Sequence, residues 1–131
     1  MTPDFLLTAA LAAREHAFAP FSKFKVGAAV EDESGHIHSG CNVESATYGL
    51  TVCAERVALF AARCAGAEEI EAIAVIADLS HPIAPCGACR QVIAELAPRA
   101  RIVMANLRGE IEIGDVDTLL PGRFEFESPA D

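Results

Sequence analysis

Three cysteines in two short motifs place the strongest constraint on how this chain can fold. Cys53 lies in VCAER at residues 52–56, and Cys86 and Cys89 lie in PCGACR at residues 85–90. Three cysteine thiolates can bind one Zn²⁺ ion and leave its fourth tetrahedral position to water, as in a catalytic rather than a structural zinc site. The fold must therefore bring two segments that are far apart in the sequence into contact.

A carboxylate accompanies the predicted zinc ligands. Glu55 lies two residues after Cys53, close enough to reach a metal-activated water without binding the metal itself. One carboxylate in that position can act first as general base towards water and then as general acid towards a ring nitrogen and a departing amine. The same combination of residues, including its three-cysteine variant, is the signature of zinc-dependent nucleobase deaminases. The two motifs therefore resemble those of such a deaminase.

Both motifs are predicted to begin helices. One helix runs from about residue 53 to 64, with Thr51 as its N-cap and Gly66 after its end, and the other lies between Pro85 and Pro98. Helix N-termini favour thiolate over thiol. The i, i+3 spacing of the cysteines in the second motif places both sulfurs on one helical face.

An arginine follows each motif directly. Three thiolates leave a zinc site with a net negative charge, which weakens the acidification of bound water. A positive side chain hydrogen-bonded to a ligand sulfur offsets that charge. Arg56 and Arg90 are the two candidates, because they follow Glu55 and Cys89 respectively. We favour Arg56 for this role.

The remaining sequence predicts an α/β fold. Apolar residues at helical spacing predict an N-terminal helix that ends at about His16. Thr2 is its predicted N-cap and Pro3 its first helical residue. Alternating or apolar segments predict strands at residues 25–30, 36–40, 72–77, 101–105 and 110–113, and Asp115 can cap a short helix that ends at Leu120. This order predicts a single domain over residues 1–131, a three-layer α/β/α sandwich with a mixed, mostly five-stranded sheet.

Composition argues against several classes of function. The net charge is −9 and the ten Lys and Arg residues form no cluster, which disfavours a nucleic-acid partner. No apolar run approaches the roughly 18–20 residues of a membrane helix, and the N-terminus lacks the basic start of a secretory signal. We therefore expect a cytoplasmic protein, in which five cysteines indicate metal ligands or free thiols rather than disulfides.

The cysteines also have less specific interpretations. A lone Cys-x-x-Cys pair occurs in redox sites, and a structural four-cysteine zinc site could recruit Cys41 or Cys64. Cys64 is roughly 16 Å from Cys53 along the predicted helix, too far to share a metal. We expect Cys41 and Cys64 to be small core residues. The histidines lie in polar contexts and are not predicted ligands: His16, His36, His38 and His81.

Four sequence blocks, in order, closely resemble the small homotetrameric cytidine deaminases. They are FKVGAA at 24–29, GCNVESA at 40–46, CAER at 53–56 and PCGACRQ at 85–91, and the resemblance spans roughly residues 19–124. It implies the cytidine deaminase fold, one Zn²⁺ per subunit and a homotetramer with shared active sites.

The resemblance also implies roles in substrate binding. Asn42 and Glu44 match the pair that hydrogen-bonds the ribose hydroxyls, a task that an amide and a carboxylate suit. Phe24 matches the aromatic that lines the pyrimidine pocket, whose polar edge is read by the backbone of Ala54 and the side chain of Glu55. Without the resemblance, Asn42 is typical of a turn, Glu44 of a solvated loop and Phe24 of a core.

Two aromatic residues are implied at subunit contacts. Phe124 matches a residue that a neighbouring subunit places over the base, and Tyr48 resembles a residue at the subunit contact near the site. The chain departs from the family pattern at three positions: Phe21 replaces a usual tyrosine, Ala84 a frequent serine, and Ser45 a common asparagine. These departures bear on substrate preference rather than on reaction type.

We therefore expect hydrolytic deamination of cytidine and 2′-deoxycytidine to their uridine counterparts, with release of ammonia, in pyrimidine salvage. The partner is a small nucleoside rather than a nucleic acid or a membrane. One alternative is a deaminase of another cytosine nucleoside, of the blasticidin S type, a group that lacks the pair Asn42 and Glu44. The other is a catalytically silent, zinc-stabilised interaction module, which would not depend on Glu55.

Overall fold

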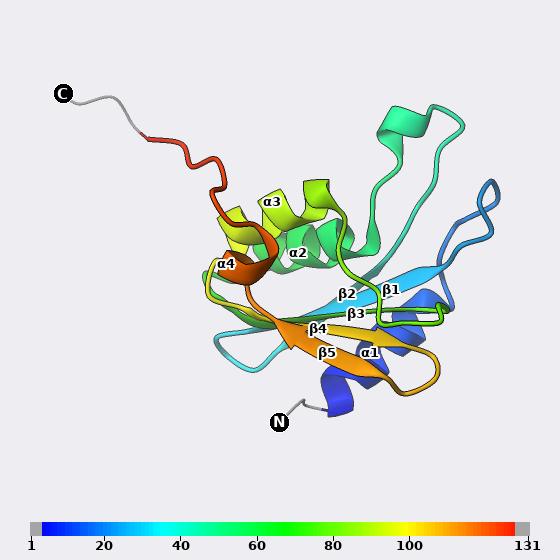
Figure 1. The fold of residues 1–131 in the computed structure, drawn as a ribbon, viewed down its shortest axis with the longest axis horizontal. Coiled ribbons are helices and arrows are strands. Elements are labelled where there is room, and N and C mark those ends of the chain that lie inside the picture. The colour runs from blue at the N-terminus through cyan, green and yellow to red at the C-terminus, as the bar shows by residue number, and fades with distance from the viewer. Residues whose placement is uncertain (1–3, 128–131) are drawn as a thin grey trace.

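A computed structural model describes residues 4–127 and contains one mixed sheet between two layers of helices (Figure 1). The elements are α1 (Asp4–Arg14), β1 (Val26–Asp32), β2 (Ile37–Cys41), the 3₁₀ helix η1 (Tyr48–Leu50), α2 (Ala54–Cys64), β3 (Ile70–Ala77), α3 (Gly87–Leu96), β4 (Arg101–Asn106), β5 (Ile111–Gly114) and α4 (Val116–Leu119). The five strands are ordered β2-β1-β3-β4-β5; β3 and β4 are parallel, and the other neighbours are antiparallel. The predicted three-layer sandwich is confirmed.

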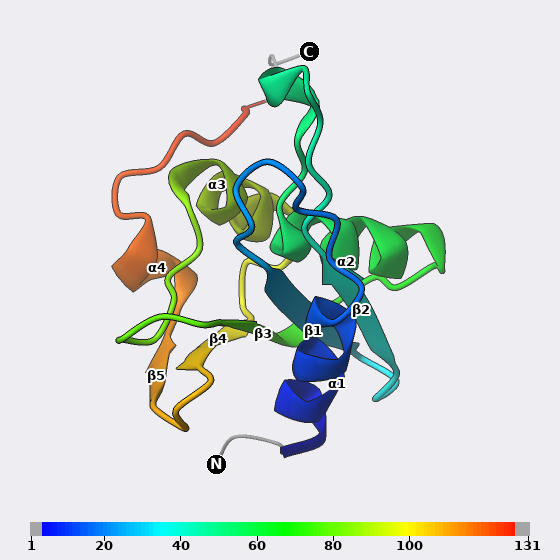
Figure 2. The ribbon, with the colours of Figure 1, turned by 90° about the vertical axis from the view of Figure 1, so that its right-hand side faces the viewer.

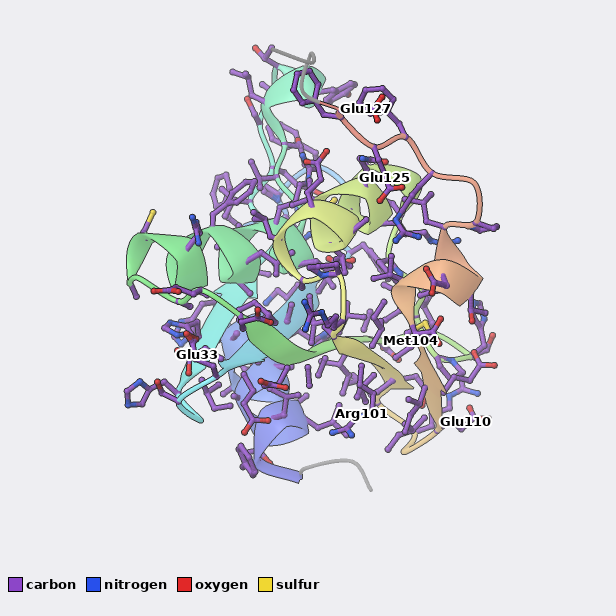
Figure 3. The ribbon with its side chains drawn as sticks, turned by 90° about the vertical axis from the view of Figure 1, so that its left-hand side faces the viewer. Glu33, Arg101, Met104, Glu110, Glu125 and Glu127 are labelled. Atoms are coloured by element: carbon purple, nitrogen blue, oxygen red, sulfur yellow. The ribbon has the colours of Figure 1, made fainter. Side chains whose placement is uncertain are left out.

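The helices cover opposite faces of the sheet, with α1 on one side and α2 and α3 on the other (Figures 1 and 2). The two-residue period of the strands separates two buried clusters. In β1, Ala28 and Val30 join the cluster under α2 and α3, whereas Ala29 joins the cluster under α1. Figure 3 shows the same alternation in β4, where Met104 points to the side of the sheet covered by α4 and Arg101 to the α1 side.

The first turn of α2 lies directly against the sheet at a glycine. A Cβ atom on Gly40, in β2, would lie 2.5 Å from the backbone nitrogen of Ala58 and 2.8 Å from the carbonyl oxygen of Ala54. Those distances are too short for real contacts, so only glycine permits this approach of helix and strand. The backbone of β2 thereby fixes the height of α2 above the sheet.

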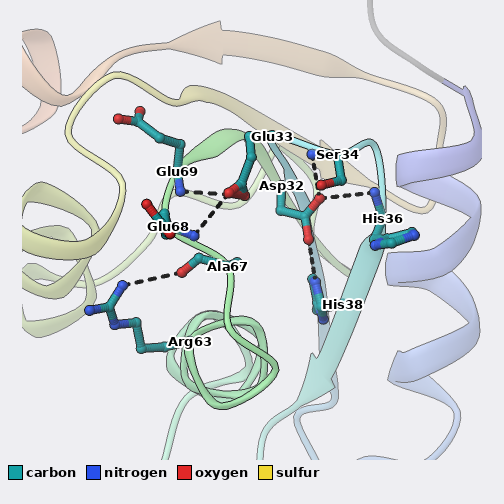
Figure 4. A network of polar contacts seen from close by, with 9 residues as sticks. All are labelled: Asp32, Glu33, Ser34, His36, His38, Arg63, Ala67, Glu68 and Glu69. Carbon is teal, nitrogen blue, oxygen red and sulfur yellow. Dashed lines mark hydrogen bonds and ion pairs between the residues drawn. The ribbon is translucent and has the colours of Figure 1, made fainter.

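A polar network secures the turn between β1 and β2 (Figure 4). The buried Asp32 accepts hydrogen bonds from the backbone nitrogens of Ser34 (2.9 Å) and His36 (3.0 Å), and its other oxygen lies 2.9 Å from Nε2 of His38. The adjacent Glu33 accepts from the backbone of Glu68 at 3.1 Å. The hairpin is therefore fastened both internally and to the loop between α2 and β3.

The sequence placed several element boundaries correctly. Asp115 caps α4 by accepting from the backbone nitrogen of Thr118 at 2.8 Å, as predicted. Gly66, with φ of +96°, follows α2 as predicted. The first strand is longer than predicted and continues to Asp32. The N-cap predicted at Thr2 and Pro3 lies outside the described residues.

Two predictions about individual residues are wrong. Thr51 does not cap α2: it follows η1, and the N-cap of α2 is Cys53. Cys64 is exposed rather than part of the core, because the buried face of α2 runs through Ala58 and Ala62 and the last residue of the helix turns away from it. Cys41 is partly buried.

Candidate metal centre and active site

The three predicted zinc ligands converge. The Sγ atoms of Cys53, Cys86 and Cys89 all lie within 4.8 Å of one another, and those of Cys53 and Cys86 are 3.9 Å apart. Within residues 4–127, no other group of three or more His, Cys, Asp or Glu ligand atoms is gathered in this way. Cys41 and Cys64 do not belong to the group.

The start of two helices creates this convergence. Cys53 is the N-cap of α2 and Cys86 is the N-cap of α3, while Cys89 lies in the first turn of α3 and is buried. We expected all three cysteines within first helical turns; two of them instead precede their helices directly. The unpaired backbone N–H groups and the positive dipole end of a helix start favour the ionised form of a nearby thiol.

Electrostatics favour a thiolate at Cys53. The pKa of Cys53 is lowered to about 5, first by a hydrogen bond with the Cys89 thiol and then by one from Arg56. The same bond, together with burial, raises the pKa of Cys89. The hydrogen bond between the two sulfurs thus favours the thiolate form at Cys53 over that at Cys89. Three close sulfurs, one of them with a lowered pKa, are a suitable ligand set for a zinc ion.

The two candidate arginines have different partners. Nη2 of Arg56 donates to Sγ of Cys53 at 3.3 Å. Arg90 instead donates to the carbonyl oxygens of Pro85 at 2.7 Å and Leu119 at 2.9 Å. Arg56 is thus the arginine that contacts a predicted ligand, and Arg90 connects the start of α3 to the end of α4.

Glu55 is buried beside the sulfurs. Only 4% of its surface is exposed. Burial, reinforced by the nearby Cys53 thiolate, raises the pKa of the Glu55 carboxyl to about 7. Such a carboxyl can hold or release a proton near neutral pH.

A cavity of about 200 Å³ opens above this carboxyl. Its walls come from the loop before β1, the end of β2, the start of α2 and the loop before α3, and its lining residues are Phe24, Val26, Asn42, Thr51, Cys53, Ala54, Glu55, Ile83, Ala84 and Cys86. The walls are mainly apolar, and the polar side chains among them are Asn42, Thr51 and Glu55, with the two cysteines. An aromatic ring with one polar edge suits this lining.

A second, more open hollow of about 400 Å³ adjoins the first. It is lined by Phe21, Ser22, Glu44, Ser45, Tyr48 and Thr51. Thr51 lines both spaces and marks their junction. Among the residues that the structure describes, no lysine or arginine lines either space.

The predicted ribose-binding residues are held firmly by the backbone around them. Asn42 is 8% exposed; its Oδ1 accepts from the nitrogen of Val26 at 2.9 Å, and its Nδ2 donates to the oxygen of Phe24 at 2.8 Å. Glu44 accepts from the backbone nitrogens of Phe21 and Ser22 at 3.0 and 3.1 Å. Asn42 lines the cavity and Glu44 lines the hollow.

The structure does not bring every predicted residue to this site. Phe124 is 70% exposed and lies with Ala94 and Glu95 of α3, away from both spaces. Tyr48, in η1, is 79% exposed and reaches the open hollow. Figure 1 shows η1 and the C-terminal segment at opposite ends of the α2–α3 layer. Sequence reasoning missed Ser22 and the lining role of Thr51, for which no motif gives a signal.

Comparison with known proteins agrees with the fold and the site. The family model for the cytidine and deoxycytidylate deaminase zinc-binding region matches residues 2–105. The cytidine deaminase of Halalkalibacterium halodurans is 48% identical over 132 residues, covering 100% of both chains. A crystal structure of cytidine deaminase from Burkholderia pseudomallei has 50% sequence identity and a TM-score of 0.91, covering 95% of this chain and 100% of that one.

A more distant relative represents one of the alternatives. The blasticidin-S deaminase of Bacillus cereus is 28% identical over 114 residues, which cover 79% of each chain. The family model covers about four fifths of the chain. The fold matches that of a solved cytidine deaminase. The chain belongs to the family of the cytidine and deoxycytidylate deaminase zinc-binding region.

Proposed function

We propose that the protein deaminates cytidine and 2′-deoxycytidine hydrolytically to uridine and 2′-deoxyuridine, with release of ammonia, in pyrimidine salvage. The main support is the buried carboxyl of Glu55, which lines one cavity together with Cys53 and Cys86. In this reaction water adds to C4 of the ring and the amino group leaves as ammonia. Protons must move from the water to the ring nitrogen and to the amine, which requires an acid–base group at the base of the pocket.

The cysteines fit one zinc ion per subunit, with Cys53, Cys86 and Cys89 as its protein ligands. Three cysteine sulfurs lie within 4.8 Å of one another at two helix N-termini. Zinc binds such soft sulfur ligands in a tetrahedral arrangement. A zinc ion bound there supplies a water that is acidic enough to act as a nucleophile near neutral pH. Arg56 reduces the negative charge of the ligand set through Cys53.

Glu55 is the catalytic residue in this proposal. Its pKa of about 7 lets it accept one proton from water and pass it to the ring nitrogen, and then carry a second proton from the added hydroxyl to the departing amine. The buried Ala54 precedes it in the lining, so that its backbone and the Glu55 side chain can bind the polar edge of the pyrimidine. Phe24 supplies an apolar wall for the ring.

A free nucleoside suits the adjoining hollow better than a nucleotide. Asn42 lines the cavity and Glu44 lines the adjoining hollow, which supports a role for both in binding the sugar, since a carboxylate accepts well from sugar hydroxyls. A 5′-phosphate would meet the negative charge of Glu44, and no lysine or arginine of the described residues lines the space. We therefore expect the substrate to be a nucleoside and not the nucleotide deoxycytidylate.

The two alternatives have less support. Deamination of blasticidin S would not use the pair Asn42 and Glu44, and the relative of that name is 28% identical, against 48% for a cytidine deaminase. A silent zinc module has no need of Glu55. Burying a carboxyl away from water costs stability, so its burial here is better explained by catalysis.

We infer a single catalytic domain that assembles as a homotetramer with shared active sites. Several large apolar side chains are exposed in the isolated chain, at Tyr48, Leu50, Phe60 and Phe124. Aromatic side chains are enriched at protein interfaces. In such an assembly Phe124 of one subunit covers the base in a neighbour's site, and Tyr48 lies at the contact.

We also infer a cytoplasmic location. Five reduced cysteines fit a reducing compartment, and salvage of nucleosides takes place there. None of the helices in the described part of the chain is long and apolar enough to span a membrane.

The direct test is to incubate the purified protein with cytidine, 2′-deoxycytidine, deoxycytidylate and blasticidin S, and to follow product and ammonia. We expect turnover of the two nucleosides, little turnover of the other two, and loss of activity with a zinc chelator that is reversed by added zinc. Preferential turnover of deoxycytidylate or blasticidin S would refute the substrate assignment, and no turnover of any of the four would refute the reaction.

A further inference from the structure

The loop of residues 18–25, which places Phe24 in the cavity, is bound to the segment of residues 42–44. The backbone nitrogen of Phe18 donates to the oxygen of Asn42 at 2.9 Å, and the nitrogen of Glu44 donates to the oxygen of Phe18 at 2.8 Å. The base-side and sugar-side walls of the site are thus two segments fastened side by side. Their relative position determines whether one nucleoside can contact both.

Ser22 makes the most specific connection between these walls. Its hydroxyl donates to Oε2 of Glu44 and accepts from the backbone nitrogen of Phe24 at 3.0 Å. One hydroxyl therefore contacts the carboxylate on the sugar side and the backbone of the aromatic on the base side. Since the hydroxyl accepts from Phe24, its single proton is available for Glu44.

The backbone next to Ser22 adopts an unusual conformation. Lys23 has φ of +64°, in the left-handed region that non-glycine residues rarely occupy, and its nitrogen donates to the oxygen of Ala19 at 2.9 Å. This turn places Phe24 directly above the Ser22 hydroxyl. Strained residues of this kind persist where the surrounding contacts hold them and are frequent at functional sites.

The contacts of Glu44 leave it a limited capacity to bind substrate. A carboxylate offers about four acceptor positions, two on each oxygen. Oε1 accepts from the backbone nitrogens of Phe21 and Ser22, and Oε2 accepts from the Ser22 hydroxyl. One acceptor position on Oε2 stays open, and Ser22 determines its direction. These hydrogen bonds, that of the hydroxyl foremost, also lower the pKa of Glu44.

We propose that Ser22 is a positioning residue that couples the sugar and base subsites: it directs the remaining acceptor of Glu44 to one sugar hydroxyl while holding Phe24 against the base. This inference rests on the proposed nucleoside deamination. It assigns sugar recognition to a hydroxyl that does not itself touch the substrate.

The test compares wild type with Ser22→Ala and Ser22→Thr, using cytidine and 2′,3′-dideoxycytidine, which lacks the sugar hydroxyls that Glu44 would bind. For Ser22→Ala we expect KM for cytidine to rise about tenfold, the effect of a lost charge-assisted hydrogen bond, with kcat changed little. The preference for cytidine over the dideoxy analogue should fall by the same factor. Ser22→Thr keeps the hydroxyl, and because residue 22 is exposed the added methyl group has room, so it should behave as wild type.

Two further measurements separate this role from simple loop damage. Ser34→Ala removes an exposed serine in the turn between β1 and β2 and should match wild type. NMR titration of the Glu44 carboxyl without substrate should give a low pKa in wild type and Ser22→Thr and a higher one in Ser22→Ala. An unchanged cytidine preference in an active Ser22→Ala enzyme, or failure of Ser22→Thr to restore it, overturns the Ser22 proposal alone. A wild-type protein that leaves cytidine unchanged overturns the proposed function instead.

Discussion

The Nη2 atom of Arg56 lies 3.3 Å from the Sγ atom of Cys53, within the first turn of the helix that also bears Glu55. A guanidinium at that distance withdraws electron density from the sulfur and raises the Lewis acidity of a metal bound to it. The positive charge also favours the thiolate form of Cys53.

We predict that Arg56→Gln lowers kcat/KM for cytidine about 10- to 100-fold, the usual effect of removing a partner of a metal ligand. Steady-state kinetics and metal analysis at matched protein concentration measure the effect. Arg63→Gln is the control, since Arg63 donates to the carbonyl of Ala67 at the opposite end of α2. Equal activity of Arg56→Gln and Arg63→Gln would show that Arg56 has no electronic role.

We predict that Glu55→Gln retains zinc and fold but loses activity by several orders of magnitude. The amide has nearly the shape of the carboxyl and remains neutral in a site where burial already disfavours charge, but it cannot accept a proton from water. Circular dichroism, metal content and turnover of cytidine test the three parts of this prediction. Turnover near the wild-type rate would contradict the mechanism.

The proposed contact of Phe124 with a neighbouring site can be tested by mixing variant subunits. In the proposed tetramer, Phe124→Ala should raise KM or lower kcat. Mixed assemblies of Phe124→Ala and Glu55→Gln subunits should be more active than the same amounts of the two variants kept apart, because some sites then combine an intact Glu55 with an intact Phe124 from the next subunit. Phe126→Ala, which removes a similarly exposed ring, is the control. Absence of any gain on mixing would argue against a shared site.

The turn at Asp32 should make stability depend on pH in the acid range. The hydrogen bond from His38, helped by the backbone of His36 and Ser34, holds the pKa of Asp32 below its ordinary value of 3.8. Between the folded and unfolded pKa values the unfolded chain binds more protons, so this contribution is complete above about pH 4 and is lost as the pH falls through the folded value.

Asp32→Asn should therefore lower Tm at pH 7, and the difference from wild type should shrink at pH 3 and below. Thermal denaturation at several pH values measures both. Asp117→Asn removes an exposed partner of Arg123 and should change Tm little at either pH, because exposed ion pairs contribute little. A constant difference between Asp32→Asn and wild type at all pH values would mean that the carboxylate charge is not the stabilising feature.

The chemistry of the site could be predicted from the sequence because it depends on residue types at fixed spacings. Cys53, Cys86 and Cys89 converge as expected, and Glu55 lies beside them. The apolar segment of residues 72–77 likewise predicted a strand, and β3 is buried on both faces at these residues.

Local competition between hydrogen bonds was harder to predict. Thr51 has the right side chain for a helix cap, but its hydroxyl accepts from the nitrogen of Ser45 at 3.0 Å, and the next residue, Val52, pairs with Val43 in an extended bridge. The helix can begin only after that bridge ends, so Cys53 becomes the N-cap. The carboxylate that Ser22 binds, Glu44, likewise lies 22 residues away, at a distance that no local pattern specifies.

The glycine contact beneath α2 limits how this enzyme can be redesigned. Because the backbone of Gly40 lies directly against Ala54 and Ala58, no side chain at this contact can be trimmed to bring Glu55 closer to the sheet, and none can be added without displacing the helix. Variation aimed at larger or modified bases is thus better directed at the loops of residues 18–25 and 78–86, whose side chains form the other walls of the cavity. Position 40 and the first turns of α2 should stay constant in any such library.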